Sequence, residues 1–328
     1  FDKLSKLVHS HPYFVVIILH EYFRNIFPSD PHIKFKTNDP VKRISMLFDS
    51  LDSIIDLLLE FGNYKLNFNK TKNIEVKKRT GTVYGNLWKN FSKNENLKTK
   101  NFIIERMKDF KSIKFNNFFK DKYILDAGCG NGRYAYALSK FNAKKVVGID
   151  YGEEGLKIGR RIFKNKNFSL KKANLLKIPF SDNSFDFVFS NGVLHHTTNL
   201  KKGLKEIVRV CKKGGHIWLY LYGAGGLYWS SRKRMNKLMK NIPQEYSQNI
   251  LNFIGMPTNR FIFMDNWYVP IEKHTTHKEI IKMLKDLKVT SVEKMISGRS
   301  TDLENGIKKY KNGNLIWGEG EIRFLIKK

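Results

Sequence analysis

The stretch YILDAGCGNGRY at residues 123–134 joins an apolar run to a glycine-rich segment, and it decides the fold class. Ile124 and Leu125 suit a buried parallel strand, because such strands read as continuous apolar runs. Three alternating glycines then predict a turn that takes positive φ and lets a ligand approach the backbone. These are Gly128, Gly130 and Gly132. A helix is expected to begin near Arg133, and the unpaired amide groups of its first turn favour an electron-rich ligand group.

The spacing of the glycines separates this turn from a dinucleotide-binding fingerprint. That fingerprint has the pattern G-x-G-x-x-G, whereas here the third glycine comes one residue early and Arg133 stands in the expected place. An acid, Asp126, also precedes the first glycine. The turn is therefore distinguished both by its spacing and by the acid ahead of it.

Strand and helix patterns alternate from residue 122 to residue 222. This alternation predicts a parallel sheet with helices on both faces. A second apolar strand ends at Asp150, and the segments 173–190, 191–197 and 206–217 follow in order. Because ligands of such sheets bind at the carboxyl ends of the strands, these segments are expected to converge on one site.

Taken in this order, the segments resemble the class I S-adenosylmethionine-dependent methyltransferases, whose first motif reads hydrophobic-Leu-Asp-x-Gly-x-Gly-x-Gly. The resemblance implies an α/β fold, a Rossmann-like, doubly wound, seven-stranded sheet whose last strand pair is antiparallel. Strands around 289–296 and 321–326 would supply that pair. It also implies S-adenosyl-L-methionine as cofactor, with S-adenosyl-L-homocysteine as the product.

The resemblance further implies which residues bind the cofactor. They are Asp126, Ala127, Gly128, Cys129, Gly130, Asn131, Gly132, Asp150, Tyr151, Asn174, Leu175, Asn191, Gly192 and Val193. Asp150 would accept hydrogen bonds from both ribose hydroxyls. Asn174 stands where the family usually has Asp, so the charge is gone, but its carbonyl oxygen can still accept a bond from the adenine amino group.

Two histidines follow the predicted fourth strand and are candidates for removing a proton from the acceptor. A histidine titrates near neutral pH, so His195 or His196 could serve as a general base. The alternative for His195 is a structural hydrogen bond to the neighbouring loop. No paired carboxylates that would hold a divalent metal stand out near this loop, and we expect metal-independent, in-line methyl transfer.

The chain outside the core is expected to form three further parts. We expect a helical appendage over residues 1–75, in which Asp39-Pro40 begins a helix. We expect a linker with an aromatic lid helix over residues 76–121. The resemblance implies that residues 122–328 are the methyltransferase domain, with a lid insertion at about 223–274 after the fifth strand. Aromatic residues that either close over the pocket or simply pack are Tyr84, Trp88, Tyr222, Trp229, Trp267 and Tyr268.

Composition limits the remaining choices. The 328 residues include 60 Lys+Arg and 30 Asp+Glu, a net charge of +30 that predicts either a polyanionic partner or solvated lysine faces. Two cysteines are too few for a disulfide scaffold and fit a reducing, cytoplasmic compartment. No apolar run reaches the ~20 residues of a membrane span, and we see no signal peptide. Self-association through the N-terminal helices is a further expectation.

Three functions are compatible with these patterns. Residues 192–197 (GVLHHT), 267–270 (WYVP) and 274–275 (HT) resemble methyltransferases of small molecules, including sugars and secondary metabolites. These act on an O, N or C atom of a metabolite, sugar or lipid-like acceptor. Residues 129–134 are also similar to RNA methyltransferases of the tRNA wobble-uridine type, and the net charge of +30 is a second reason to consider an RNA substrate. The third possibility is a non-catalytic cofactor-binding subunit.

Overall fold

The structure is a computed structural model that describes residues 1–26, 37, 39–60, 83–85, 87–88, 99–108, 110–255, 260–295 and 302–328. The chain forms two compact units. The sheet unit comprises Val76–Ala224, Ile271–Arg299 and Glu319–Lys328. The helical unit comprises Phe1–Glu75, Gly225–Pro270 and Ser300–Gly318. The predicted linker around residues 64–80 lies outside the described residues.

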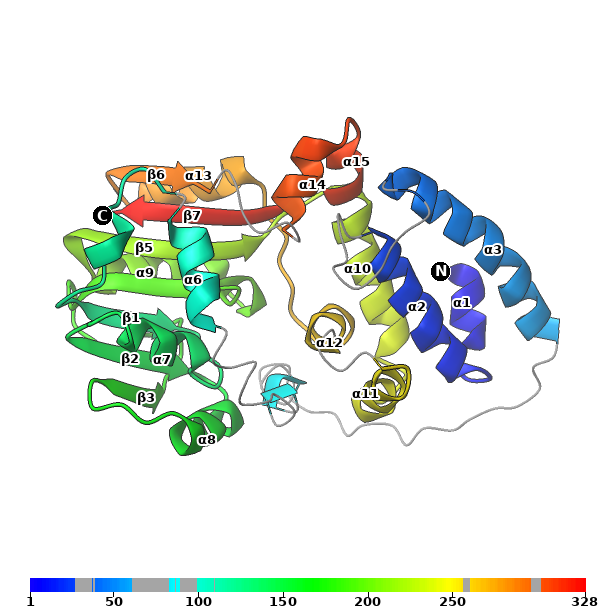
Figure 1. Ribbon diagram of the computed structural model, residues 1–328, viewed down its shortest axis with the longest axis horizontal. Helices are drawn as coiled ribbons and strands as arrows, with labels where there is room; N and C mark the ends of the chain where they lie inside the picture. The colour runs from blue at the N-terminus through cyan, green and yellow to red at the C-terminus, as the bar shows by residue number, and fades with distance from the viewer. Residues whose placement is uncertain are drawn as a thin grey trace. The chain divides into compact units, whose positions relative to one another are not determined.

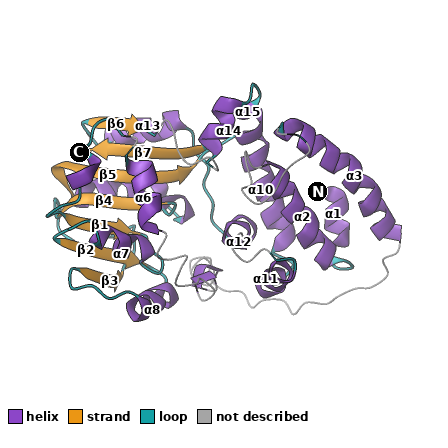
Figure 2. Ribbon diagram, in the orientation of Figure 1, coloured by secondary structure: helices purple, strands orange, loops and turns teal. Residues whose placement is uncertain are grey.

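The sheet unit is built on a seven-stranded sheet with the order β3-β2-β1-β4-β5-β7-β6 (Figures 1 and 2). Its strands are β1 (Tyr123–Ala127), β2 (Lys145–Asp150), β3 (Phe168–Lys172), β4 (Phe185–Asn191), β5 (Cys211–Tyr222), β6 (Ser291–Lys294) and β7 (Glu321–Lys327). Strands β1 to β5 are parallel, whereas β7 is antiparallel to both β5 and β6. The predicted doubly wound sheet with an antiparallel end is confirmed.

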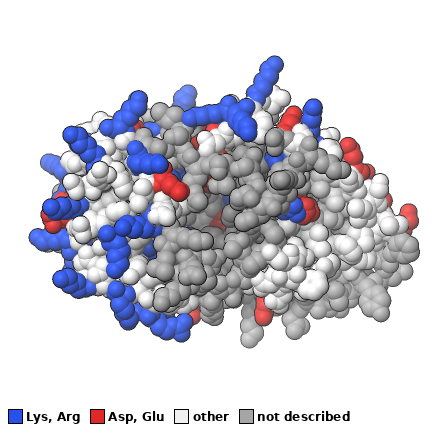
Figure 3. Space-filling view, in the orientation of Figure 1, with Lys and Arg blue, Asp and Glu red and all other residues white. Residues whose placement is uncertain are grey.

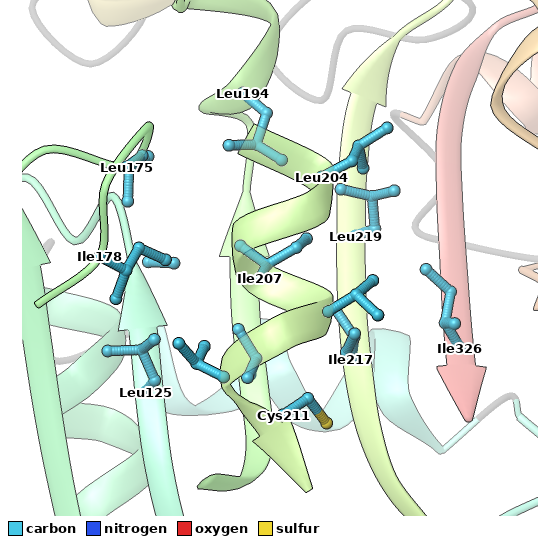
Figure 4. Close-up of a cluster of buried hydrophobic side chains, with 14 of the residues drawn as sticks. Leu125, Leu175, Ile178, Leu194, Leu204, Ile207, Cys211, Ile217, Leu219 and Ile326 are labelled. Carbon is cyan, nitrogen blue, oxygen red and sulfur yellow. The ribbon is translucent and has the colours of Figure 1, made fainter. Parts of the chain in front are cut away.

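Helices cover both faces of this sheet. They are α6 (Thr99–Met107), η1 (Phe115–Asn117), α7 (Arg133–Ser139), α8 (Glu153–Ile162), η2 (Leu194–His196), α9 (Leu200–Val210) and α13 (His277–Asp286). Alternate residues of β1 point to opposite faces, so Ile124 packs with α6 and α7, and Leu125 packs with α9 and α13. Figure 4 shows Leu204 and Ile207 of α9 lying against β5, in the buried apolar cluster that contains Leu125.

Local sequence explains where the helices of the sheet unit begin. Helix α9 starts after Asn199, whose side chain accepts a hydrogen bond from the Lys202 amide at 2.9 Å. Helix α13 starts after Thr276, which forms a capping box with Glu279. Each cap satisfies amide groups that the helix itself leaves unpaired. The caps thus fix the ends of the two helices that cover the Leu125 face.

The helical unit brings together the predicted N-terminal appendage and most of the predicted insertion. Its helices are α1 (Asp2–Leu7), α2 (Pro12–Ile26), α3 (Pro40–Glu60), α10 (Gly226–Met239), α11 (Gln244–Phe253), α12 (Arg260–Tyr268), α14 (Leu303–Lys309) and α15 (Gly313–Trp317). Phe23 of α2 contacts Tyr228 and Phe263 edge-on, at centroid distances of 5.8 Å. The Trp317 indole donates to the Ile26 carbonyl at 2.9 Å. Segments far apart in the sequence therefore share one core.

None of the helices in the described part of the chain is long and apolar enough to cross a membrane.

Candidate functional site

The glycine turn after β1 has the backbone conformation that its sequence predicts. Gly128, Gly130 and Gly132 have φ values of 94°, 56° and 82°. The amides of Gly128 and Cys129 both donate to the Ile149 carbonyl, at 2.8 and 2.9 Å. Because Ile149 belongs to β2, these bonds tie the turn to the end of the neighbouring strand. The turn is thus held in place at the carboxyl edge of the sheet.

Asp150, at the end of β2, braces the same turn. One carboxylate oxygen accepts from the Gly130 amide at 2.8 Å, and the other accepts from the Gly152 amide at 2.7 Å. Burial raises the pKa of Asp150, and the two amide bonds counter that rise. Each carboxylate oxygen has more than one acceptor site, so both can also accept from a ligand. Asp150 therefore positions the turn and still offers acceptors to hydroxyl groups.

Asp126, at the end of β1, is buried beneath the turn with 1% of its surface exposed. Burial and the negative charge of Asp150 raise its pKa to about 8, against the opposing effects of the Ala135 amide and Arg133. Among the residues the structure describes, its Oδ2 atom has no hydrogen-bond partner. A buried acceptor of this kind is costly to leave unsatisfied, and it suits a cationic or hydrogen-bonding ligand group.

The side chains of Val193 and Trp88 pack closely against the glycine turn. A Cβ atom on Gly128 would lie 2.3 Å from Val193, and one on Gly130 would lie 2.6 Å from the Trp88 indole. Trp88 is 9% exposed, and the Arg133 guanidinium lies 5.2 Å from its ring centroid. The structure therefore brings the predicted lid residue Trp88 directly against the glycine turn.

The two candidate histidines lie in an aromatic cluster beyond β4. His195 stacks on Tyr222 with centroids 3.7 Å apart, and His196 lies 5.7 Å from Tyr84 and 5.4 Å from Tyr222. The Nδ1 atom of His196 is 2.7 Å from the Ile271 carbonyl oxygen. Since a carbonyl only accepts, Nδ1 carries the proton and Nε2 is the acceptor nitrogen of the neutral ring. Four of the predicted catalytic and lid residues thus meet in one place.

The other residues that were predicted to bind the cofactor have different surroundings. Asn174 uses its side-chain oxygen to accept from the Leu176 amide at 2.9 Å, and the Leu175 side chain packs in the core. Tyr151 is 47% exposed. Asn191 accepts from the Trp218 indole at 3.0 Å. The side chain of Asn174 therefore shapes its own loop, whereas that of Asn191 links β4 to β5.

The other three predicted lid aromatics belong to the helical unit and are buried there. Trp267 stacks on Phe263 with centroids 5.2 Å apart. The Tyr268 hydroxyl lies 2.6 Å from the Ser247 hydroxyl, and Trp229 contacts Tyr228 edge-on. Each of the three therefore has a packing or hydrogen-bonding partner inside the helical unit. Their closing over a pocket remains a prediction.

A polar cluster near Gly192 was not predicted from the sequence. The Tyr220 hydroxyl donates to Glu321 at 2.5 Å, and Arg323 pairs with Glu321 while its guanidinium lies 4.7 Å from the Tyr220 ring centroid. A Cβ atom on Gly192 would lie 3.1 Å from the Tyr220 ring. The cluster depends on the register of β5 with β7, which pairs Tyr220 with Arg323. No local motif signals that pairing.

No group of three or more His, Cys, Asp or Glu side chains that could hold a metal ion occurs in the described part of the chain.

Comparison with known proteins gives matches over the core of the sheet unit. A family model described as a methyltransferase domain matches residues 125–219. The demethylmenaquinone methyltransferase of Geobacillus kaustophilus is 32% identical over 174 residues, which cover 48% of this chain and 74% of that protein. The enzyme of the same name from Staphylococcus carnosus is 32% identical over 148 residues, or 44% of this chain. The match spans 60% of the Staphylococcus protein's own length.

The solved structures that match this chain include an S-adenosylmethionine-dependent methyltransferase from Mesorhizobium loti. It is 16% identical, covers 64% of this chain and 92% of its own, and has a TM-score of 0.43.

Proposed function

Because the chain belongs to the family of S-adenosylmethionine-dependent methyltransferases and uses S-adenosylmethionine as cofactor, we propose that it methylates a small-molecule acceptor. The observation that supports this proposal best is the braced glycine turn, with buried Asp126 and Asp150 at the ends of two adjacent strands. These groups lie at the carboxyl edge of the sheet, where ligands of such folds bind.

The residues of this site fit the cofactor. Asp150 would accept from the ribose hydroxyls with the lone pairs that its two amide bonds leave. The Oδ2 atom of Asp126 would accept from the ammonium group of the methionine end, which satisfies a buried acceptor. The cofactor supplies a sulfonium-bound methyl group, which an acceptor atom takes in line.

The cluster of His195, His196, Tyr84 and Tyr222 is the proposed acceptor end of the site. We assign proton removal to His196, because its Nδ1 proton is held by the Ile271 carbonyl and Nε2 is left as the basic nitrogen. His195 stacks on Tyr222 and would position the acceptor side of the pocket. Holding the reacting atoms in line can supply ~7–11 kcal/mol of the barrier, and water exclusion by Tyr84 and Trp88 would assist.

The alternative RNA substrate is less well supported. Among the described residues on the face drawn in Figure 3, Lys and Arg side chains are dispersed over the sheet unit and do not form one continuous band. A band leading to the site would be expected of an RNA-binding surface. The relatives from Geobacillus and Staphylococcus are named for demethylmenaquinone, a small molecule. The two cysteines are free and buried, which supports the proposed cytoplasmic location.

The protein incubated with methyl-labelled S-adenosylmethionine and a cell extract should label the small-molecule fraction. Once the acceptor is isolated, His196→Gln should lower kcat by about 100-fold or more, because it removes the base. Its cofactor affinity should stay unchanged, since His196 lies beyond the glycine turn. Label found only in RNA would replace the small-molecule proposal, and equal kcat in both proteins would remove His196 from catalysis.

Replacing Asp150 by Ala should weaken cofactor binding by about 1.5–3 kcal/mol, which is the range for hydrogen bonds to a charged group. The variant loses both the acceptors for the ribose and the brace on Gly130. Calorimetric titration with S-adenosylhomocysteine measures the effect. Asp182→Ala is the matched control, because this acid is exposed and pairs only with Arg209 among the described residues. Equal affinities in the two variants would exclude Asp150 from the site.

A further inference from the structure

Helix α3 of the helical unit exposes an unusual amount of apolar surface. Its buried residues Ile44 and Ile55 face α1 and α2, against which the helix packs. Five large apolar side chains on the same helix are nevertheless exposed. These are Val41 (45%), Met46 (49%), Phe48 (49%), Ile54 (45%) and Leu57 (53%). A cluster of exposed apolar side chains on one element indicates an interaction surface, whereas single ones do not.

Part of this surface forms a regular stripe. Met46, Ser50, Ile54 and Leu57 are spaced by four, four and three residues, so they lie along one side of the helix. This spacing is that of helices that pack side by side at a shallow angle. Ser50, near the middle of the helix, is small and allows two backbones to approach closely. The stripe therefore has the shape of a helix–helix interface.

The charges at the two ends of the stripe complement each other when the helix direction is reversed. Lys42 lies in the first turn of α3 and Glu60 at its last residue, and both are exposed. They are 18 residues apart, which is about five helical turns, so they lie on the same edge of the stripe. An antiparallel copy of α3 would place Lys42 beside the partner's Glu60, and Glu60 beside the partner's Lys42. A parallel copy would place like charges together.

We propose that the exposed stripe of α3 is the interface of an antiparallel homodimer, in which it is covered by α3 of a second copy. A two-fold axis requires a patch that is complementary to itself, and the apolar stripe with Lys42 and Glu60 at its two ends meets that requirement. Asp49 is a further exposed acid of α3, whereas Asp52 and Asp56 pair with Lys3 of α1 at 2.8 and 2.9 Å. The stripe therefore lacks the cluster of basic residues that would attract an anionic membrane surface. The proposal does not depend on the acceptor or on the methyl-transfer reaction.

The expected dimer is weak. A helix of 21 residues is about 30 Å long, so two such faces bury on the order of 1,000 Å², at the lower limit for specific interfaces. We therefore expect a dissociation constant in the micromolar range. Sedimentation equilibrium of the full chain between about 1 and 100 µM covers this range.

Three sets of variants test the interface. Ile54→Glu places a charge in the stripe and should abolish the dimer, whereas Leu315→Glu, at an apolar residue that is 72% exposed on α15, should not. Lys42→Glu and Glu60→Lys should each weaken the dimer by about five-fold, because two exposed ion pairs become like-charge pairs. The double variant restores both pairs and should dimerise as the wild type does. Circular dichroism checks that each variant folds.

Each contrary outcome overturns the proposal. A wild-type monomer at 100 µM, or a dimer unchanged by Ile54→Glu, would exclude α3 as the interface. A double variant as weak as the single ones would exclude the antiparallel arrangement. Co-sedimentation of monomeric wild type with phosphatidylcholine vesicles, lost in Ile54→Glu, would show that the stripe binds lipid instead.

Discussion

The Gly130→Val variant is expected to fold but to bind S-adenosylmethionine and S-adenosylhomocysteine at least about 100-fold more weakly than the wild type. Gly130 has a φ of 56°, which a β-branched residue adopts only with strain. A Cβ atom there would lie 2.6 Å from the Trp88 indole, so the turn or the indole must move. Movement of the turn would break the bond from the Gly130 amide to Asp150. The variant therefore disturbs the backbone of the turn, its hydrogen bond to Asp150 and the packing of Trp88 together.

Gly214→Val is the matched control for backbone strain. Gly214 has a φ of 74°, but a Cβ atom there would meet nothing within 4 Å. Both variants should lose some thermal stability, because both force a side chain onto a positive φ. Only Gly130→Val should lose binding in a calorimetric titration. Affinity within about three-fold of the wild type in Gly130→Val would mean that the cofactor does not bind on this turn.

Much of the sheet unit could be predicted because its signals are local. The glycine turn and the apolar runs that end at Asp126 and Asp150 each lie within about ten residues of sequence. The antiparallel strands predicted at 289–296 and 321–326 are also present, as β6 and β7. The fifth strand, after which the insertion was predicted at about residue 223, runs from Cys211 to Tyr222. Its first part contains Gly214 and Gly215, which weaken a strand pattern, although the backbone of both is hydrogen-bonded to Lys328.

The contacts that sequence reasoning missed are those that join distant segments. The bond from Tyr220 to Glu321 spans 101 residues and requires one register of β5 against β7. The helical unit likewise joins α2 to α10 and α12 through Phe23, which contacts Tyr228 and Phe263. Apolar periodicity predicts that a helix has a buried face, but it does not tell which helix will cover that face. The partners of such faces must be read from the structure.

The Asp126→Asn variant should gain stability relative to the wild type as the pH rises. Asp126 is 1% exposed, and burial together with the charge of Asp150 raises its pKa to about 8. The unfolded chain ionises at a pKa near 3.8, so between that value and about 8 the unfolded state releases a proton that the folded state retains. The stabilisation by the protonated carboxyl is complete below pH ~4 and is lost as the pH rises through the folded pKa.

Asparagine has nearly the same shape but cannot ionise, so it does not suffer this loss. At about 1.4 kcal/mol for each unit of pKa shift, the difference in unfolding free energy should grow by a few kcal/mol from pH 4 to pH 8. Urea unfolding of both proteins at pH 5, 6.5 and 8 measures the difference. Asp182→Asn, at an acid whose side chain is 67% exposed, provides the control and should show no such trend.

The same measurement with saturating S-adenosylhomocysteine separates a structural role of Asp126 from a cofactor-binding role. If the ammonium group of the methionine end approaches Oδ2, the ionised carboxylate gains a partner and its pKa falls. The wild type should then lose less stability as the pH rises, whereas the variant should not change its pH dependence. A difference between the proteins that is constant from pH 5 to pH 8 would show that Asp126 is already ionised in the folded state. A pH dependence that the ligand leaves unaltered would place the ammonium group elsewhere.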